Sequence, residues 1–169
     1  MAVTEWAIYI ETRRPDGSRE RCEIGAIRRD LSAPVPDDLG LRLAEAKDLL
    51  QQLQLRMIDG QIDQSAALDR RCCHCDLTRP LHDRRQRVIQ TLFGMVPVRQ
   101  PRLRTCPCRR PEADSSGSGG RSRRVSMLLK GRATPELVGI QTELGARLSF
   151  REAARVTDLF LQVASAPIT

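Results

Sequence analysis

Apolar and polar residues alternate over residues 5–12 and again over residues 20–28. The apolar positions are Trp6, Ile8 and Ile10 in the first segment, then Cys22 and Ile24, with Ala26 as a further candidate. Residues 15–18 between them read Pro-Asp-Gly-Ser, a composition typical of a tight turn. The pattern therefore predicts an antiparallel hairpin, which needs a cover because two strands are not stable alone.

A spacing of four and three residues then predicts a helix that runs to about Arg70, after Pro34 and Pro36 and with Asp37 or Asp38 as its cap. Its apolar seam consists of Leu39, Leu43, Ala46, Leu50, Leu53 and Met57. Gly60 is expected to interrupt the helix, which then continues on a shifted face. The seam can either pack on the opening hairpin or pair with a second copy of the chain, and the sequence leaves both open.

Helical spacing returns near the end of the chain. Thr134 followed by Pro135 predicts a helix start, and Gly145 its end. Ser149 with Glu152 predicts a capping box for a second helix. The expected buried face of that helix consists of Ala153, Ala154, Val156, Leu159, Phe160 and Val163. The pair fits part of a helix-turn-helix unit, or an ordinary helical hairpin.

Two close cysteine pairs lie between the long helix and the tail, Cys72-x-x-Cys75 and Cys106-x-Cys108. They flank an alternating apolar stretch that turns at Gly94. Two nearby thiolates can occupy two corners of a tetrahedral metal site, and a distant pair can supply the others. We therefore predict a structural zinc site with these four cysteines as ligands, although the second pair is one residue closer than usual.

Other interpretations of these cysteines stay open. Cys73, His74 and His82 are near enough in sequence to form a different ligand set. Disulfides or unpaired thiols are further alternatives, but the first residues contain no apolar signal-peptide core. A reducing, cytoplasmic setting is therefore expected, and it disfavours disulfides. Cys22 stands apart and is expected to be a small core residue.

The net charge of +7 is concentrated around the cysteines. Residues 72–132 carry 14 basic and 4 acidic side chains, whereas the residues before and after them are slightly acidic. Nearly all the basic residues are arginines, whose planar donors suit phosphates and base edges. A basic patch beside a metal site predicts nucleic-acid binding, with a solvated basic face as the alternative. No apolar run is long enough to cross a membrane, so no membrane partner is expected.

The candidate phosphate contacts lie on the hairpin between the cysteine pairs. They are Arg84, Arg85, Arg87, Arg99, Arg102 and Arg104. Pro97 and Pro101 are expected to confine the second strand to a sheet edge, with its arginines exposed along an open side.

These patterns predict an α+β chain in four parts. Residues 1–71 form the β-hairpin and the long amphipathic helix, and residues 72–108 a small zinc-ribbon-like β module. Residues 109–126 are expected to be a flexible, basic Ser/Gly linker. Residues 127–169 are expected to be helical and partly helix-turn-helix-like.

Four stretches resemble the N-terminal region of a group of bacterial insertion-sequence transposases, the Kra-type elements. They are residues 38–54 (DLGLRLAEAKDLLQQLQ), 72–75 (CCHC), 90–108 (QTLFGMVPVRQPRLRTCPC) and 133–154 (ATPELVGIQTELGARLSFREAA). Together with the opening hairpin they span nearly the whole chain. The family shows the same close C-P-C pair, which supports the four cysteines as ligands. The family usually has proline at the position of Cys73, so either Cys72 or Cys73 remains possible as a ligand.

The resemblance implies a region that recognises the DNA ends of an insertion element in the bacterial cytoplasm, associated with the nucleoid. In the family, a later domain with three acidic residues holds magnesium and cuts and joins DNA. That domain is expected to be missing here, so the expected function is that of a truncated, non-catalytic transposase that is not an enzyme. The alternative is a structural or interaction protein that forms a homodimer through residues 39–57 and whose zinc site only holds the fold.

Overall fold

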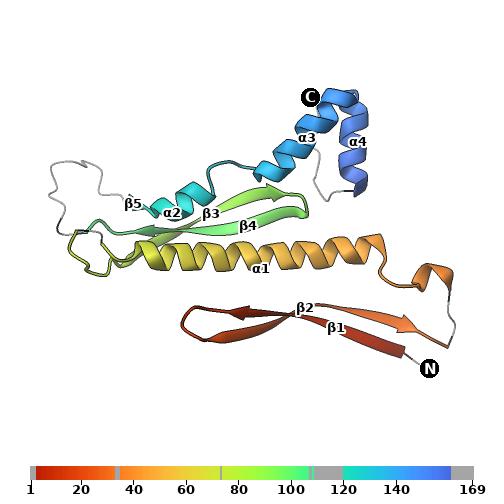
Figure 1. The fold of residues 1–169 in the computed structure, drawn as a ribbon, viewed down its shortest axis with the longest axis horizontal. Coiled ribbons are helices and arrows are strands. Elements are labelled where there is room, and N and C mark those ends of the chain that lie inside the picture. The colour runs from red at the N-terminus through yellow and green to blue at the C-terminus, as the bar shows by residue number, and fades with distance from the viewer. Residues whose placement is uncertain (1–2, 33–34, 73, 107, 109–119, 161–169) are drawn as a thin grey trace. The chain divides into compact units, whose positions relative to one another are not determined.

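The computed structural model describes residues 3–32, 35–72, 74–106, 108 and 120–160 (Figure 1). The elements are β1 (Val3–Arg13), β2 (Arg19–Asp30), a 3-10 turn (Pro36–Asp38), α1 (Leu43–Asp69), β3 (Leu81–Thr91), β4 (Gly94–Leu103), β5 (Gly120–Arg121), α2 (Arg123–Leu128), α3 (Pro135–Arg147) and α4 (Phe150–Phe160). The predicted α+β class is confirmed. The chain forms two compact units, unit 1 (Met1–Leu55) and unit 2 (Arg56–Thr169), so their boundary lies within α1.

In unit 1, β1 and β2 form the predicted antiparallel hairpin. The register has one bulge, because Ile8 lies opposite Gly25 whereas the next residue of β1 lies opposite Glu23. Ile24 is the extra residue, and it changes the face to which the later residues of β2 point. Ala26 is exposed as a result, so its predicted place on the apolar face is wrong.

The first turns of α1 contact this hairpin at Gly25 of β2. A Cβ atom at Gly25 would lie 2.7 Å from Cδ2 of Leu49, so the missing side chain lets the helix approach the strand closely. The contact comes from Leu49 and not from its neighbour in the predicted seam, Leu50, which is exposed. Leu43 and Met57 of the same seam are exposed too.

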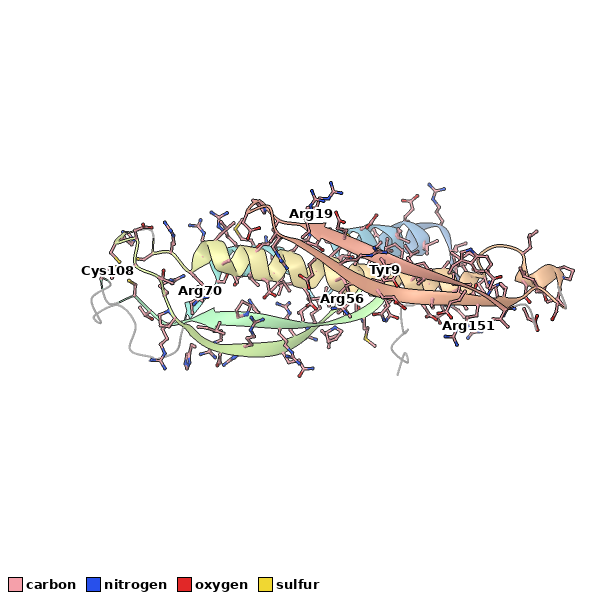
Figure 2. All side chains as sticks on the ribbon, turned by 90° about the horizontal axis from the view of Figure 1, so that it is seen from below. Tyr9, Arg19, Arg56, Arg70, Cys108 and Arg151 are labelled. Carbon is pink, nitrogen blue, oxygen red and sulfur yellow. The ribbon has the colours of Figure 1, made fainter. Side chains whose placement is uncertain are left out.

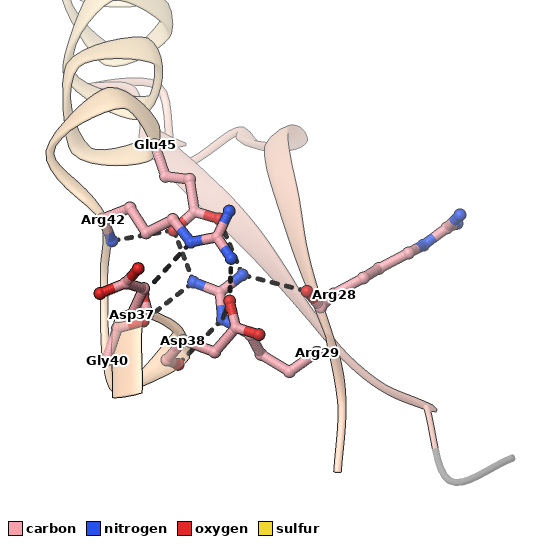
Figure 3. Close-up of polar contacts among 7 residues, drawn as sticks. All are labelled: Arg28, Arg29, Asp37, Asp38, Gly40, Arg42 and Glu45. Carbon is pink, nitrogen blue, oxygen red and sulfur yellow. Dashed lines mark hydrogen bonds and ion pairs between the residues drawn. The ribbon is translucent and has the colours of Figure 1, made fainter. Parts of the chain in front are cut away.

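A buried arginine ties β2 to the start of α1 (Figure 3). The two terminal nitrogens of Arg29 donate to the two carboxylate oxygens of Glu45, at 2.7 and 2.6 Å. The same guanidinium donates to the carbonyl oxygens of Asp38 and Gly40. Glu45 also accepts from the backbone N–H of Arg42 at 2.9 Å, as the third residue of a capping box does. This network fixes the start of the helix.

The helix differs from the prediction at its start and at Gly60. It begins at Leu43, so Leu39 precedes it, and it continues through Gly60 to Asp69 over 27 residues, or about 40 Å. A glycine inside a helix costs only about 1 kcal/mol relative to alanine. Ile62 and Ala66 are buried just beyond it, and this packing holds the helix together.

In unit 2, β3 and β4 form the predicted hairpin around Leu92 and Phe93, with Gly94 at a φ of +110°. The strand order is β3-β4-β5, so β4 is central where β5 pairs with its last two residues. The predicted edge position is therefore wrong for that end of β4. Pro97 and Pro101 lie outside the β4–β5 ladder, in agreement with their lack of an N–H donor.

The core of unit 2 is aliphatic and draws on five elements or the turns after them. Its buried residues include Ile62, Ala66, Ile89, Val96, Val98, Leu103, Val125, Leu129 and Leu137. Figure 1 shows the β3–β4 hairpin between the second half of α1, from Arg56 on, and the α2–α3 segment. Side-chain contacts join the hairpin to both neighbours, from Arg84 to Asp63 of α1 and from Gln100 to Ser126 of α2.

Residues 120–128 form β5 and α2, although residues up to 126 were expected to be a flexible linker. Ser122 is fully buried and caps α2 by accepting from the N–H of Val125. Its hydroxyl donates to Asp69 at the end of α1, at 2.6 Å, and the N–H of Arg124 donates to the same oxygen at 2.8 Å. The remainder of the expected linker, residues 109–119, lies outside the described residues.

The two C-terminal helices follow the prediction with one difference. Thr134 precedes α3, which continues past Gly145 to Arg147. The capping box at α4 is confirmed, because the N–H of Ser149 donates to Glu152 and the N–H of Glu152 to the Ser149 hydroxyl.

The expected buried face of α4 is only partly buried. Leu159 is exposed, whereas Ala153, Ala154 and Val156 are half-buried. Val163 and the side chain of Phe160 lie outside the described residues. The part of the chain that the structure describes contains no helix long and apolar enough to span a bilayer.

The Arg29–Glu45 pair makes the stability of unit 1 depend on pH. The side-chain hydrogen bonds from Arg29, followed by that from the Arg42 N–H, lower the pKa of Glu45 from its ordinary 4.5 to about 2. Because the pKa of Glu45 is lower in the folded than in the unfolded chain, ionised Glu45 stabilises the fold at any pH above its unfolded pKa of 4.5. This contribution is lost as the pH falls from about 4.5 towards 2. In Glu45→Gln we expect lower stability at neutral pH and a weaker loss across that window.

Denaturant unfolding can be followed through the fluorescence of Trp6, the single tryptophan, which lies on β1. Glu20→Gln is the matched control, because the ion pair of Glu20 with Arg14 in the same unit is exposed. Equal pH dependence in Glu45→Gln and the wild type would contradict the assignment.

Candidate metal centre

The four predicted cysteines converge at one end of unit 2. The sulfur atoms of Cys72, Cys75, Cys106 and Cys108 all lie within 4.8 Å of one another. The two pairs meet at distances of 3.5 Å from Cys72 to Cys108 and 3.3 Å from Cys75 to Cys106. Thirty residues of intervening chain are therefore folded back on themselves to bring the pairs together.

The first pair sits on a tight loop directly after α1. The Cys72 N–H donates to the carbonyl oxygen of Leu77 at 3.0 Å, and the N–H of Asp76 donates to that of Cys72 at 2.9 Å. Asp76 has a φ of 55°, a left-handed conformation that asparagine and aspartate adopt more readily than most residues. Arg71 and Thr78 pair as an isolated bridge and close the loop.

The second pair is positioned by the end of β4. The N–H of Arg104 donates to the carbonyl oxygen of Pro80 at 3.0 Å, which fixes the chain between the hairpin and Cys106. Cys72 and Cys106 are buried, Cys75 is half-buried and Cys108 is exposed. The centre is thus closed on the side of the core and accessible at Cys108.

The surroundings favour the thiolate of Cys72 and disfavour those of Cys75 and Cys108. Hydrogen bonds from the backbone N–H groups of His74 and Cys75 lower the pKa of Cys72 to about 6. The nearby sulfurs, Cys106 first, raise the pKa of Cys108. The N–H of Leu77 favours the Cys75 thiolate, but the sulfur of Cys106 and burial outweigh it and raise the pKa of Cys75. Four adjacent thiolates require a cation that offsets their repulsion.

This arrangement fits a tetrahedral metal ion. Zinc–sulfur bonds of about 2.3 Å place neighbouring sulfurs about 3.8 Å apart, close to the distances here. Among the described residues, neither histidine joins the cluster, and both His74 and His82 are exposed. The four cysteines can therefore hold a metal ion such as zinc without the alternative histidine ligands. Cys73 lies outside the described residues.

The predicted phosphate-contacting arginines have different surroundings. Arg102 is buried and pairs with Asp83, at 3.3 Å, although the arginines of this strand were expected to be exposed. Arg87 is half-buried and donates to the carbonyl oxygens of Leu129 and Gly131. These two side chains hold the hairpin against neighbouring elements of the fold.

The other four predicted arginines are exposed. Arg84 pairs with Asp63 of α1 at 3.2 Å, and Arg99 lies close enough to lower the pKa of Asp59, although burial and Asp63 raise it overall. The guanidinium groups of Arg85 and Arg104 have no partner among the described residues.

The junction between Asp69 and Ser122 was missed by sequence reasoning. Asp69 lies three residues before Cys72 and binds Ser122 and Arg124 at the start of α2. These contacts connect the metal centre to the core. The available signal was Ser122 followed by Val125 and the apolar run at residues 127–129, which is typical of a capped helix start.

Comparisons with known proteins found neither a matching family model nor a match among curated proteins or solved structures.

The cluster predicts a defined response to metal removal. We expect about one zinc per chain by elemental analysis and a lower melting temperature in the presence of a chelator, because metal binding contributes directly to folding. Cys106→Ser should lose the metal and most of the chelator effect. Cys22→Ser is the matched control, since Cys22 is a half-buried cysteine on β2, outside the cluster. A folded protein that holds no metal and ignores chelators would contradict the assignment.

Proposed function

We propose that the chain is the DNA-binding region of an insertion-sequence transposase, in which a structural zinc ion holds a basic module that recognises the ends of the element. One observation carries the proposal, namely that four cysteine sulfurs converge within 4.8 Å inside the most basic part of the chain. The four sequence stretches that resemble Kra-type transposases support the identity of the partner. The proposed region binds DNA without cutting it.

The chemistry of the centre supports a structural role for the metal. Four thiolates complete the tetrahedral coordination of zinc, so no open position is left for water or substrate. Bound zinc would neutralise the thiolates and join the loop after α1 to the end of β4. The chain's own contribution is to hold the arginines around this centre in fixed positions, which reduces the entropy lost on binding.

Specific recognition predicts a preference between two DNA duplexes. One carries the sequence that flanks the coding region in the genome, and the other is a scrambled duplex of equal length and composition. In an electrophoretic shift assay at moderate salt, the flanking duplex should bind at least tenfold more tightly, because specific complexes exceed non-specific ones by larger factors. Equal affinity would remove the specific part of the proposal.

A second candidate function is a structural protein that dimerises through residues 39–57, with a zinc site that only holds the fold. The exposure of Leu43, Leu50 and Met57, seven residues apart on α1, favours it. Side chains at this spacing form one stripe of a helix, as in the seam of a coiled coil. Leu39 does not take part in this stripe, because it precedes the helix.

Light scattering tests the dimer. Leu50→Glu should halve the mass measured for the wild type, because it places a charge in the seam. Gln52→Glu adds the same charge on an exposed position of the same helix outside the stripe and should leave the mass unchanged. A wild-type monomer, or a dimer that tolerates Leu50→Glu, would exclude this helix as the interface.

A further inference from the structure

The arginines that the sequence singled out do not form one free basic surface. Arg87 and Arg102 are used inside the fold, and Arg84 faces an aspartate of α1. An arginine whose donors already have partners must give them up before it can bind a phosphate. Arg87 and Arg102, which are held by partners within the fold, therefore contribute little to the attraction of DNA, and the predicted set as a whole is not the phosphate-binding surface.

A second group of arginines surrounds the cysteine cluster. We define the cysteine-end arginines as Arg70, Arg71, Arg104 and Arg123, all of them exposed. Figure 2 shows Arg70 at the same end of unit 2 as Cys108. Only Arg104 belongs to the hairpin candidates predicted from the sequence.

Backbone hydrogen bonds hold the first three of these residues at one end of unit 2. Arg70 and Arg71 open the cysteine loop, and the N–H of Arg79 donates to the carbonyl oxygen of Arg70 at 2.7 Å. Arg104 is tied to Pro80, the next residue after Arg79 in the chain. A metal in the cluster would fix the same segments.

Arg123 joins this end through the start of α2. It follows Ser122, whose hydroxyl donates to Asp69, the residue before Arg70. Arg124, by contrast, pairs with Asp69 at 3.2 Å and is neutralised.

The charges of this end are largely uncompensated. The guanidinium groups of Arg104 and Arg123 have no partner in the part of the chain that the structure describes. The guanidinium of Arg70 donates a long hydrogen bond, at 3.5 Å, to the carbonyl oxygen of Arg79. Arg71 pairs with Asp76 at 3.4 Å, and both side chains are about three-quarters exposed. An exposed pair of this kind contributes little and exchanges readily for a phosphate.

We infer that the DNA phosphate backbone binds at the cysteine-end arginines, around the metal centre, and not along the strands of the β3–β4 hairpin. This inference rests on the proposed function, since it assigns the surface through which that function operates. The metal centre then orders the contact surface itself in addition to the fold. Phosphate contacts carry no sequence information, so loss of these arginines weakens binding to every duplex.

Two double variants with the same change of charge separate the surfaces. Arg104→Gln with Arg123→Gln removes two cysteine-end arginines, and Arg84→Gln with Arg99→Gln removes two exposed arginines of the hairpin. The affinity for a fluorescently labelled mixed-sequence duplex is measured over a range of salt concentrations. Each lost phosphate contact lowers the slope of log affinity against log salt by about 0.9. The cysteine-end variant should therefore lose a slope of about 1.8, and the hairpin variant should keep the wild-type slope.

Controls distinguish a local loss of contact from misfolding. Both variants should keep the zinc content and melting temperature of the wild type, and Arg104→Lys with Arg123→Lys should keep the wild-type slope because the charge is retained. If the double glutamine variant loses zinc, Arg123→Gln alone serves instead, with an expected loss of about 0.9.

The other outcomes each overturn a stated part of the account. If the cysteine-end variant keeps the wild-type salt slope, or if both variants lose the same slope, the assigned surface is wrong. DNA binding itself is not affected by that result. A wild-type protein that does not bind the duplex at all overturns the proposed function and this surface together.

Discussion

Convergence of four cysteine sulfurs is the constraint on which unit 2 depends. Cys72 and Cys75 directly follow α1, whereas Cys106 and Cys108 follow β4, so the cluster joins the ends of a helix and a hairpin. Without a cation the neighbouring sulfurs raise the pKa of Cys108 and oppose further ionisation. A bound divalent metal would reverse this effect and convert four competing thiols into one closed site. The arginines nearby would then be held in place by the same bonds.

Buried arginines have structural roles in both units. In unit 1, Arg29 joins β2 to the first turn of α1 through Glu45, and in unit 2 Arg102 pairs with Asp83 across the hairpin. A guanidinium can satisfy several acceptors at once, which suits an aliphatic chain with few aromatic residues to fill its core. The count of arginines therefore overstates the positive charge available to a partner. Part of what remains lies next to the cysteines, at the exposed Arg70, Arg71, Arg104 and Arg123.

The sequence predicted the parts of the fold that depend on local patterns. Alternation predicted both hairpins, the Ser149–Glu152 pair predicted the start of α4, and the spacing of the cysteines predicted the cluster. Gly60 was wrongly expected to break α1, because the cost of one glycine is small compared with the packing of Ile62 and Ala66 around it. Local signals were sufficient wherever the neighbouring residues alone determine the conformation.

Features that depend on distant residues could not be predicted in this way. Ser122 is fixed by Asp69, 53 residues earlier, so a segment with the composition of a linker forms a strand and a capped helix. Burial of Arg102 depends on where Asp83 and β5 lie, and the outward turn of Ala26 depends on a bulge. None of these leaves a periodic trace in the sequence.

Cobalt substitution tests the central claim most directly, because the absorption of Co²⁺ reports both the ligands and their geometry. The metal-free protein should take up about one Co²⁺ per chain with the strong visible absorption of a tetrahedral site and a thiolate charge-transfer band. Zinc should displace it completely, and Cys106→Ser should abolish that spectrum. Weak absorption typical of six-coordinate cobalt, or a tetrahedral spectrum that Cys106→Ser leaves unchanged, would contradict a centre built from these four cysteines.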